Sequence, residues 1–170
     1  MKLDKLVRLT NKYFKYAAKE KDTDSGAGIL FTCEEDGTLL LILRSKKVND
    51  PNVWGLPGGG VRREGEDNQN ETNLEGAKRE ATEELGCLPK SMKYITHVAD
   101  KKKDFTYTTY VYNLSLKDKK DWSKKIELDW ENSDWKWFKV DELPNKLHYG
   151  MESLHDLLAD KGFEIFSLPE

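Results

Sequence analysis

Residues 58–87, GGGVRREGEDNQNETNLEGAKREATEELGC, concentrate the most specific chemistry of this 170-residue chain. The stretch opens with three glycines and closes with a predicted helix that carries Glu80, Glu83 and Glu84. Residues three and four apart share one face of a helix, so these carboxylates are expected to crowd together. A divalent cation would remove the repulsion between them, and carboxylate oxygens suit Mg²⁺. The stretch therefore predicts a cation site.

Acidic residues are also common on solvated helix faces, so the glutamates alone do not establish a metal site. Their surroundings favour one. Ala77 and Ala81 lie on the same side of the helix and are small enough to let a substrate or another backbone approach. Arg79 is placed to pair with Glu83 at the i, i+4 spacing. Gly86 follows as a C-cap, which predicts where the helix ends.

The same stretch resembles the Nudix box, the family signature of a glycine, five residues, Glu, seven residues and then R-E-apolar-x-E-E-x-G-apolar. Gly65 and Glu71 are six residues apart, and Arg79 follows Glu71 by eight. The sequence REATEELGC supplies the rest, with Ala81 and Cys87 in the apolar positions. On this motif the chain is similar to the Nudix hydrolases, which include MutT-like proteins.

Two flanking segments extend the resemblance. The sequence WGLPGGG at residues 54–60 resembles the usual lead-in of the family, and WFKVDELP at residues 137–144 resembles its late strand and turn. The similarity therefore covers most of residues 26–145 and leaves both ends of the chain outside it.

One departure from the family pattern concerns the loop before the helix. The family usually has its glycines and its Gly-Glu step close together, as GGxxxxGE. If Gly60 is the box glycine, Glu66 falls six residues later, but Leu74 stands where the arginine should be. Counting back from the helix makes Glu71 the box glutamate, and the simplest explanation is an insertion of residues 66–70. Which glycine belongs to the box stays open at this point.

The resemblance implies a fold and an activity. The fold is an α/β/α sandwich with a mixed β-sheet, and adjacent strand hairpins beside a single helix also exclude a purely parallel doubly wound sheet. The implied reaction is the Mg²⁺-dependent hydrolysis of a nucleoside diphosphate linked to another moiety, with Mn²⁺ as a possible substitute. The implied metal ligands are the helix carboxylates and a glycine carbonyl, namely Glu80, Glu83, Glu84 and Gly59 or Gly60.

The resemblance also implies roles for the remaining charged residues. Glu83 would accept the proton of the attacking water, with Glu131 in reserve, Arg79 would hold the carboxylates, and Glu71 would act from behind them. Members of the family often carry one more acidic residue before the late Trp-containing strand. Glu131 is the first choice for it, and Asp134 or a plain solvated carboxylate is the alternative.

Other functions stay open on the sequence alone. A Nudix-fold module can bind a nucleotide without cleaving it, as a sensor, although the intact set of box carboxylates argues against this. A purely structural or partner-binding protein gives no reason for the sequence REATEELG. An isopentenyl diphosphate isomerase of the same fold is disfavoured by the positions of Cys33 and Cys87. Candidate substrates are nucleoside triphosphates, ADP-ribose, nucleotide sugars, dinucleoside polyphosphates and the 5′ end of triphosphorylated RNA, with small nucleotides favoured.

Composition sets the broad class. A chain of 170 residues suits one domain with its own core, and a net charge of −3 argues against a general nucleic-acid binder. The two cysteines show no pairing pattern and indicate free thiols in a reducing compartment. No apolar run is long enough for a membrane span, so a cytoplasmic protein is the expectation. Nothing in the sequence indicates the oligomeric state.

The expected elements follow from periodicity. Residues 1–24 are expected to form an amphipathic helix and a linker, ahead of a Nudix domain over residues 25–170 that ends in a helix. A hairpin with a turn at Asp36 and Gly37 joins the first two strands. Arg44 ends the second strand, either as a surface residue or as a phosphate contact. The remaining expectations are strands at 27–33, 39–44, 93–100, 105–116 and 135–140, a lysine-rich turn at 101–103, a surface loop at 118–125 and a helix at 151–160.

Overall fold

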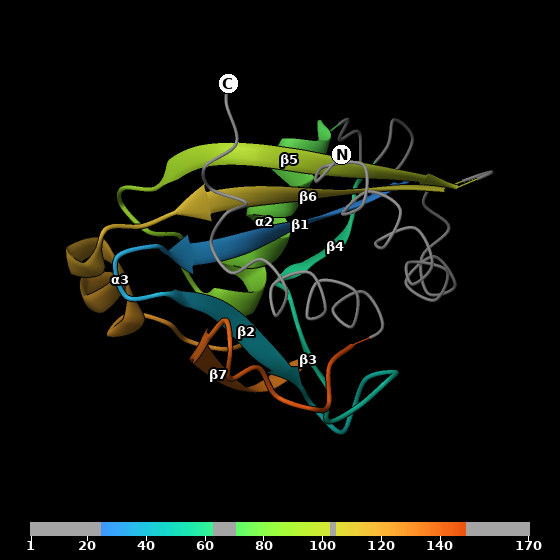
Figure 1. Ribbon diagram of the computed structural model, residues 1–170. Coiled ribbons are helices and arrows are strands. Elements are labelled where there is room, and N and C mark those ends of the chain that lie inside the picture. Colours follow the sequence, from blue (N-terminus) through green and yellow to red (C-terminus); the bar gives the residue numbers. More distant parts are fainter. Residues whose placement is uncertain (1–24, 63–70, 103–104, 149–170) are drawn as a thin grey trace.

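The computed structural model describes residues 25–62, 71–102 and 105–148 (Figure 1). The predicted N-terminal helix with its linker, the insertion at 66–70 and the predicted helix at 151–160 lie outside these residues. The described residues include the sheet, the helix that carries the glutamates, and the segments that join them.

A seven-stranded sheet forms the body of the molecule, with strand β1 at its centre. The order is β3-β2-β1-β6-β5, while β4 pairs with β1 and β7 pairs with β2. Strands β1 and β6 run parallel and every other pair runs antiparallel, so the predicted mixed α/β sheet is confirmed. The strands are β1 Ser25–Cys33, β2 Thr38–Arg44, β3 Trp54–Gly55, β4 Gly58–Gly60, β5 Lys93–Lys102, β6 Phe105–Asn113 and β7 Asn132–Lys139.

The two hairpins differ in how well local sequence predicted them. Gly37 adopts a φ of 72°, which suits glycine, and forms the predicted turn between β1 and β2. The turn predicted at 101–103 is wrong in its bounds, because Lys101 and Lys102 still belong to β5 and pair with Thr106 and Phe105. The ladder between β5 and β6 therefore runs further than the polarity of the lysines suggested.

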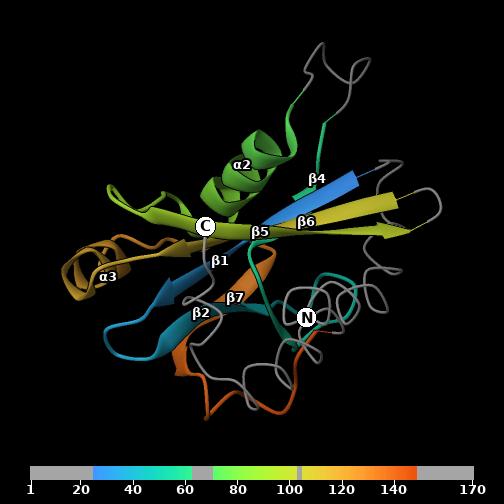
Figure 2. The same ribbon diagram turned by 45° about the horizontal axis from the view of Figure 1, so that its top comes forward.

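Helix α2, Asn73–Leu85, lies across one face of the sheet (Figure 2). It begins at Thr72, whose hydroxyl accepts from the Glu75 amide while the Glu75 carboxylate accepts from the Thr72 amide. It ends where predicted, at Gly86, with a φ of 79°. The inward side packs into an apolar core that includes Ala77, Ala81, Leu85, Ile29, Phe31, Ile42 and Val61.

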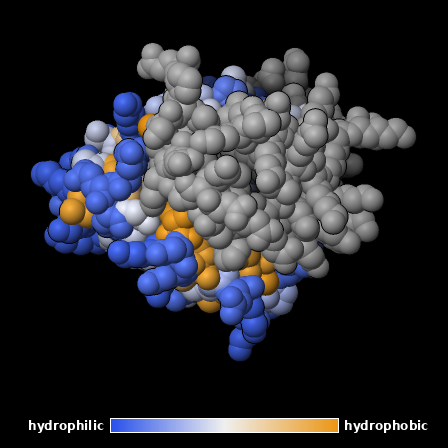
Figure 3. Space-filling view, viewed as in Figure 1, coloured by the Kyte–Doolittle hydropathy of each residue, from blue (hydrophilic) through white to orange (hydrophobic). Residues whose placement is uncertain are grey.

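A second apolar cluster covers the opposite face of the sheet. It combines strand residues with residues that follow β7, namely Leu30, Leu39, Leu41, Val111, Phe138, Val140, Leu143 and Leu147. In Figure 3 the hydrophilic surface around α3 gives way to hydrophobic residues over β2 on this face. No helix in the part of the chain that the structure describes is long and apolar enough to cross a membrane.

The surface loop predicted at 118–125 is wrong, because most of it is helix α3, Leu116–Ser123. Ser115 caps the helix by accepting from the Asp118 amide. Trp122 is buried with its ring 4.7 Å from that of Phe31. Lys119 is also buried, and its ammonium donates to Asp36. The segment looks polar in sequence because only two of its side chains face the core, which is too few for a periodic signal.

Candidate active site

Helix α2 divides its three glutamates between the interior and the surface. Glu80 and Glu84 are one turn apart on the inward face, and each is only 7% exposed. Glu83 lies on the flank of the helix, and its side chain is 50% exposed. The sequence predicted one crowded group of carboxylates. The structure instead sets two buried carboxylates beside a third that reaches solvent.

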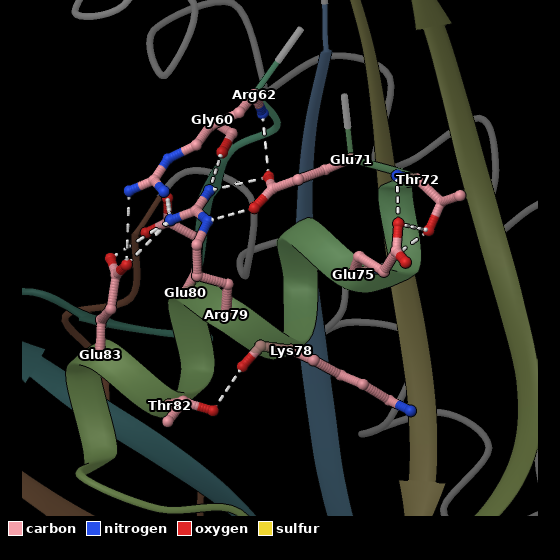
Figure 4. Close-up of polar contacts among 10 residues, drawn as sticks. All are labelled: Gly60, Arg62, Glu71, Thr72, Glu75, Lys78, Arg79, Glu80, Thr82 and Glu83. Carbon is pink, nitrogen blue, oxygen red and sulfur yellow. Dashed lines mark hydrogen bonds and ion pairs between the residues drawn. The ribbon is translucent and has the colours of Figure 1, made fainter. Parts of the chain in front are cut away.

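Arg79 is the residue that ties this region together (Figure 4). Its Nε donates to Glu71 Oε1 at 2.6 Å, and its Nη1 donates to Glu80 Oε1 at 2.8 Å and to Glu83 Oε2 at 3.2 Å. Its Nη2 donates to the Gly60 carbonyl at 2.8 Å. Burial alone would lower the pKa of Arg79, but hydrogen bonds to Glu71 and Glu80 outweigh it and raise the pKa. The predicted pairing with Glu83 is confirmed, and a permanent positive charge faces three carboxylates.

Glu71 is held from two sides at the entrance to α2. Besides its contact with Arg79, its Oε2 accepts from the Arg62 amide at 3.0 Å. Burial favours a higher pKa for Glu71, but the hydrogen bonds from Arg79 and from the Arg62 amide prevail and lower it. The Glu71 amide in turn donates to the Arg62 carbonyl at 3.1 Å. The chain therefore leaves at residue 62 and returns beside it at residue 71.

The three glycines form strand β4. None of them has a positive φ, so their value lies in close approach. A Cβ on Gly59 would lie 2.5 Å from the Glu80 carboxyl carbon. A Cβ on Gly58 would lie 2.6 Å from the Ala27 carbonyl oxygen and 2.6 Å from the Tyr107 hydroxyl. Strand β4 thus fits between a carboxylate on one side and a tyrosine ring on the other.

Glu84 is the most enclosed carboxyl of the site. Its Oε2 accepts from the Gly58 amide at 2.7 Å, and its Oε1 accepts from Asn132 Nδ2 at 3.3 Å. Burial raises the pKa of Glu84 to about 8, and the charges of Glu80 and Asp129 push it in the same direction. A carboxylate oxygen can accept two hydrogen bonds, so these contacts leave a lone pair on each oxygen.

The donor set fits a hard divalent ion, since it consists of carboxylate and carbonyl oxygens. No three acidic, histidine or cysteine side chains converge on one point within residues 25–62, 71–102 and 105–148. The guanidinium of Arg79 lies between Glu80 and Glu83 and donates to both.

The loop before β7 approaches Glu84, but through residues that the sequence did not single out. Asn132 is buried and donates to Glu84, and the same Nδ2 lies 3.1 Å from Asp129 Oδ1. Glu131 is half-buried, and its carbonyl accepts from the Ser45 amide. Asp134 is exposed and accepts from the amide of the next residue. No local pattern marks Asn132, because its partner lies 48 residues away.

Tyr107 is a second residue that the sequence did not single out. Its ring lies across β1, so that a Cβ on Gly26 would approach it to 2.7 Å and one on Gly28 would approach its hydroxyl to 2.5 Å. Burial raises the pKa of Tyr107, and the charges of Glu84 and Glu80 add to the effect. The glycines of β1 and β4 are the only signal in the sequence for a ring packed there.

Arg44 and the cysteines complete the comparison with the sequence. Arg44 Nε and Nη2 both donate to the Asn49 carbonyl, at 3.0 and 2.7 Å, so the guanidinium braces the loop that follows β2. Its predicted phosphate contact stays a prediction. Cys33 and Cys87 are free thiols, as expected.

Fold and site together define an α/β protein with a carboxylate-bearing helix packed behind a glycine strand. The sequence matches the NUDIX domain family over residues 22–158, which is more than half of the chain. The chain therefore belongs to the NUDIX family and, with its box intact, to the Nudix hydrolases. No curated protein matches it significantly.

Solved structures share the fold at low identity. The Ap4A hydrolase of C. elegans, determined as a binary complex, is 18% identical with a TM-score of 0.60, and the match covers 84% of this chain and 99% of that one. The Nudix hydrolase RenU of M. smegmatis is 19% identical with a TM-score of 0.61, covering 86% of each chain. The NUDIX domain of Shewanella oneidensis NrtR, in complex with ADP ribose, is 18% identical with a TM-score of 0.50, covering 84% and 90%. At these identities the likeness shows the fold.

Proposed function

We propose that this chain is a divalent-metal-dependent hydrolase that cleaves the diphosphate linkage of a nucleoside diphosphate joined to another moiety. One observation carries the proposal. Arg79 joins Glu71, Glu80 and Glu83 into one network, and the buried Glu84 lies beside the glycine strand. Burying acidic groups this way costs free energy unless they are paired or bind a cation. An arrangement that gathers them around a single arginine is suited to a metal-assisted site.

Mg²⁺ is the proposed ion, with Mn²⁺ as a substitute, because the donors are all oxygens. The ligands would come from Glu80, Glu83 and Glu84, together with the carbonyl of Gly59 or Gly60. When bound, the ion supplies charge neutralisation at the phosphate oxygens and makes a bound water more acidic. Both glycine carbonyls stay candidates, because the Gly60 oxygen that accepts from Arg79 keeps a second lone pair.

The protein's own residues would handle the proton and the geometry. Glu83 is the proposed base, because its carboxylate is half exposed and can reach a water, while Glu80 and Glu84 are buried. Glu131 is the reserve. Arg79 would keep Glu80 and Glu83 in place through two hydrogen bonds from one nitrogen. Glu71 would fix the plane of the guanidinium through its two-point contact.

Small nucleotides are the proposed substrates. The structural neighbours include an Ap4A hydrolase and a domain in complex with ADP ribose, which makes dinucleoside polyphosphates and ADP-ribose the first compounds to test. Arg44 is the proposed phosphate contact, because a guanidinium that donates to a loop carbonyl still has N–H groups to offer. The 5′ end of triphosphorylated RNA stays in the panel.

The second candidate function is a sensor that binds a nucleotide without cleaving it. It uses the same helix and glycine strand and needs no base. The complete carboxylate set argues against it, since a module that only binds nucleotide gains nothing from buried acidic side chains facing a phosphate.

A substrate panel decides between the two functions. The purified protein is incubated with ADP-ribose, Ap4A, nucleotide sugars, nucleoside triphosphates and triphosphorylated RNA, in Mg²⁺, in Mn²⁺ and in EDTA. Hydrolysis in ¹⁸O water then shows which phosphorus the water attacks. Metal-dependent cleavage of at least one compound, lost in EDTA and restored by excess Mg²⁺, is expected. Tight binding of a compound that stays intact under all conditions would favour the sensor, and full activity in metal-free buffer would refute the metal site.

A further inference from the structure

The turn before β7, residues 127–132, is hydrogen-bonded to the end of helix α2 through both its backbone and a side chain. The Asp129 amide donates to the main-chain carbonyl of Glu84 at 3.4 Å, and Glu127 makes the corresponding bond to Leu85 at 3.0 Å. The side chain of Asn132 reaches the Glu84 carboxylate itself. Backbone and side chain of the same glutamate are therefore both held by one short turn.

Within this turn, Asp129 fixes the amide of Asn132. Asp129 Oδ1 accepts from Asn132 Nδ2 at 3.1 Å and from the Glu131 amide at 3.1 Å. An amide nitrogen has two hydrogens, so Nδ2 donates one to Asp129 and the other to Glu84. Two acidic acceptors require that the nitrogen, and not the oxygen, of the amide faces them. The orientation of Asn132 is thereby determined by its neighbours.

We infer that Asn132, oriented by Asp129, is a positioning residue that holds the Glu84 carboxylate in the rotation needed to bind the metal. The inference rests on the proposed function and deepens it. The Gly58 amide holds one oxygen of Glu84, and Asn132 holds the other, so the two donors together define the plane of the carboxylate. Removing one of them leaves a single hydrogen bond about which the carboxylate can turn.

Asp129 acts through Asn132 in this scheme and is not itself a ligand. Its Oδ1 is occupied by two donors from its own turn, which point it at Asn132. Removing a residue that hydrogen-bonds to a metal ligand, without contacting the metal itself, commonly weakens metal binding by about 10- to 100-fold. The turn is therefore expected to influence metal binding, although Asn132 and Asp129 touch neither metal nor substrate.

A double-mutant cycle on Mn²⁺ binding tests the inference. Free Mn²⁺ is measured by electron paramagnetic resonance for the wild type, Asn132→Leu, Asp129→Ala and the double variant. Leucine keeps the branching of asparagine and removes the donor. Ser133→Ala is the matched control, because Ser133 is exposed and its hydroxyl only reaches the Leu43 carbonyl at 3.4 Å. Glu84→Gln is the reference for a lost ligand, and thermal unfolding confirms that each variant is folded.

Asn132→Leu is expected to weaken Mn²⁺ binding about 10- to 100-fold, with a lower kcat and a nearly unchanged KM for the cleaved substrate. Asp129→Ala is expected to show a smaller loss. The double variant should match Asn132→Leu within about twofold, because Asp129 has nothing left to orient. Ser133→Ala should bind as the wild type does.

Each contrary result has its own meaning. Wild-type affinity in Asn132→Leu overturns the inference while leaving the proposed function intact. A further large loss in the double variant shows that Asp129 binds the metal directly, which also overturns it. If Asn132→Leu does not fold, Asn132→Ala replaces it in the cycle, and wild-type affinity in Asp129→Ala refutes the orienting role. Absence of Mn²⁺ binding in the wild type refutes the proposed metal site itself, and the inference falls with it.

Discussion

Arg79 and Glu71 form a two-point contact, in which Nε lies 2.6 Å from Oε1 and Nη2 lies 3.2 Å from Oε2. The guanidinium and carboxylate planes match in such a contact, so it fixes orientation as well as distance. Glu71 is also hydrogen-bonded to the Arg62 backbone. Arg79 is therefore linked through Glu71 to residue 62, where the chain leaves strand β4, as well as to residue 71, where it returns. The carboxylates that Arg79 contacts are therefore held in position relative to the sheet as well as to their own helix.

The first prediction concerns residues 66–70, which the sequence predicts to be an insertion. Deleting them shortens the segment between residues 62 and 71 but keeps Arg62 and Glu71 able to pair, because three residues between them are enough for a tight turn. Loop length itself carries a small entropy cost, roughly 0.6 kcal/mol per doubling. The deletion variant is expected to fold and to keep metal-dependent hydrolysis, with changes confined to substrate preference. Thermal unfolding and the substrate panel measure both properties.

A different outcome would reassign the glycine of the box. If Gly65 belongs to the metal site in its present spacing from Glu71, the deletion variant would fold and lose Mn²⁺ binding. That result would show that Gly60 is not the box glycine.

The second prediction concerns the carboxylates. Glu83→Gln and Glu84→Gln should each lower kcat by about 100-fold or more, because a lost base or ligand forfeits several kcal/mol and each 1.36 kcal/mol is tenfold. Neither change should unfold the protein, since Glu83 is half exposed and a neutral amide replaces a buried acid at Glu84. Steady-state kinetics and unfolding midpoints check this. Glu75→Gln, at the helix start, is the control and should keep wild-type turnover.

The third prediction separates function from stability within strand β4. Gly59→Ala places a methyl group against the Glu80 carboxylate, which can shift but then loses its place beside Arg79. Gly58→Ala places it against the backbone of Ala27, which cannot shift cheaply. We expect Gly59→Ala to lose activity with a small change in Tm, and Gly58→Ala to lower Tm strongly. The reverse order of effects would contradict the packing described for β4.

The fourth prediction tests helix α3. Lys119→Met removes the ammonium that donates to Asp36 and Thr38, and should cost about 1–2 kcal/mol in free energy of unfolding. The cost stays below that of a fully buried pair, because the Asp36 side chain is 31% exposed. Urea unfolding of both proteins at neutral pH gives the difference.

The pH dependence of that difference follows from Asp36. Burial would raise the pKa of Asp36, but hydrogen bonds from Lys119 and Thr38 lower it below its ordinary value of 3.8. A carboxyl with a lowered pKa stabilises the fold above its unfolded pKa and loses this contribution as the pH falls through the folded pKa. The gap between wild type and Lys119→Met is therefore expected to be full above pH 5 or so and to shrink on acidification. A gap independent of pH would show that Lys119 acts by packing alone.

Short-range sequence patterns by themselves determined several local features of the structure. A cap at Gly86, a pair between Arg79 and Glu83, and a turn at Gly37 each depend on residues within four positions of one another, and all three appear in the structure. Glu71, eight residues before Arg79, meets it in the two-point contact, and its role as the box glutamate stays a prediction. The β5–β6 hairpin was foreseen as two strands, although its length was not.

Tertiary contacts alone decided the remaining features. The glycines at 58–60 form a strand because β1 offers them a partner and Tyr107 and Glu80 leave no space for side chains. Residues of α3 form a helix because Trp122 has a place against Phe31. Asn132 reaches Glu84 because the turn before β7 is hydrogen-bonded to the end of α2. The local sequence around a hydrogen-bond donor or an apolar side chain does not indicate which distant residue it will contact. These features therefore depend on tertiary contacts that form only in the folded chain.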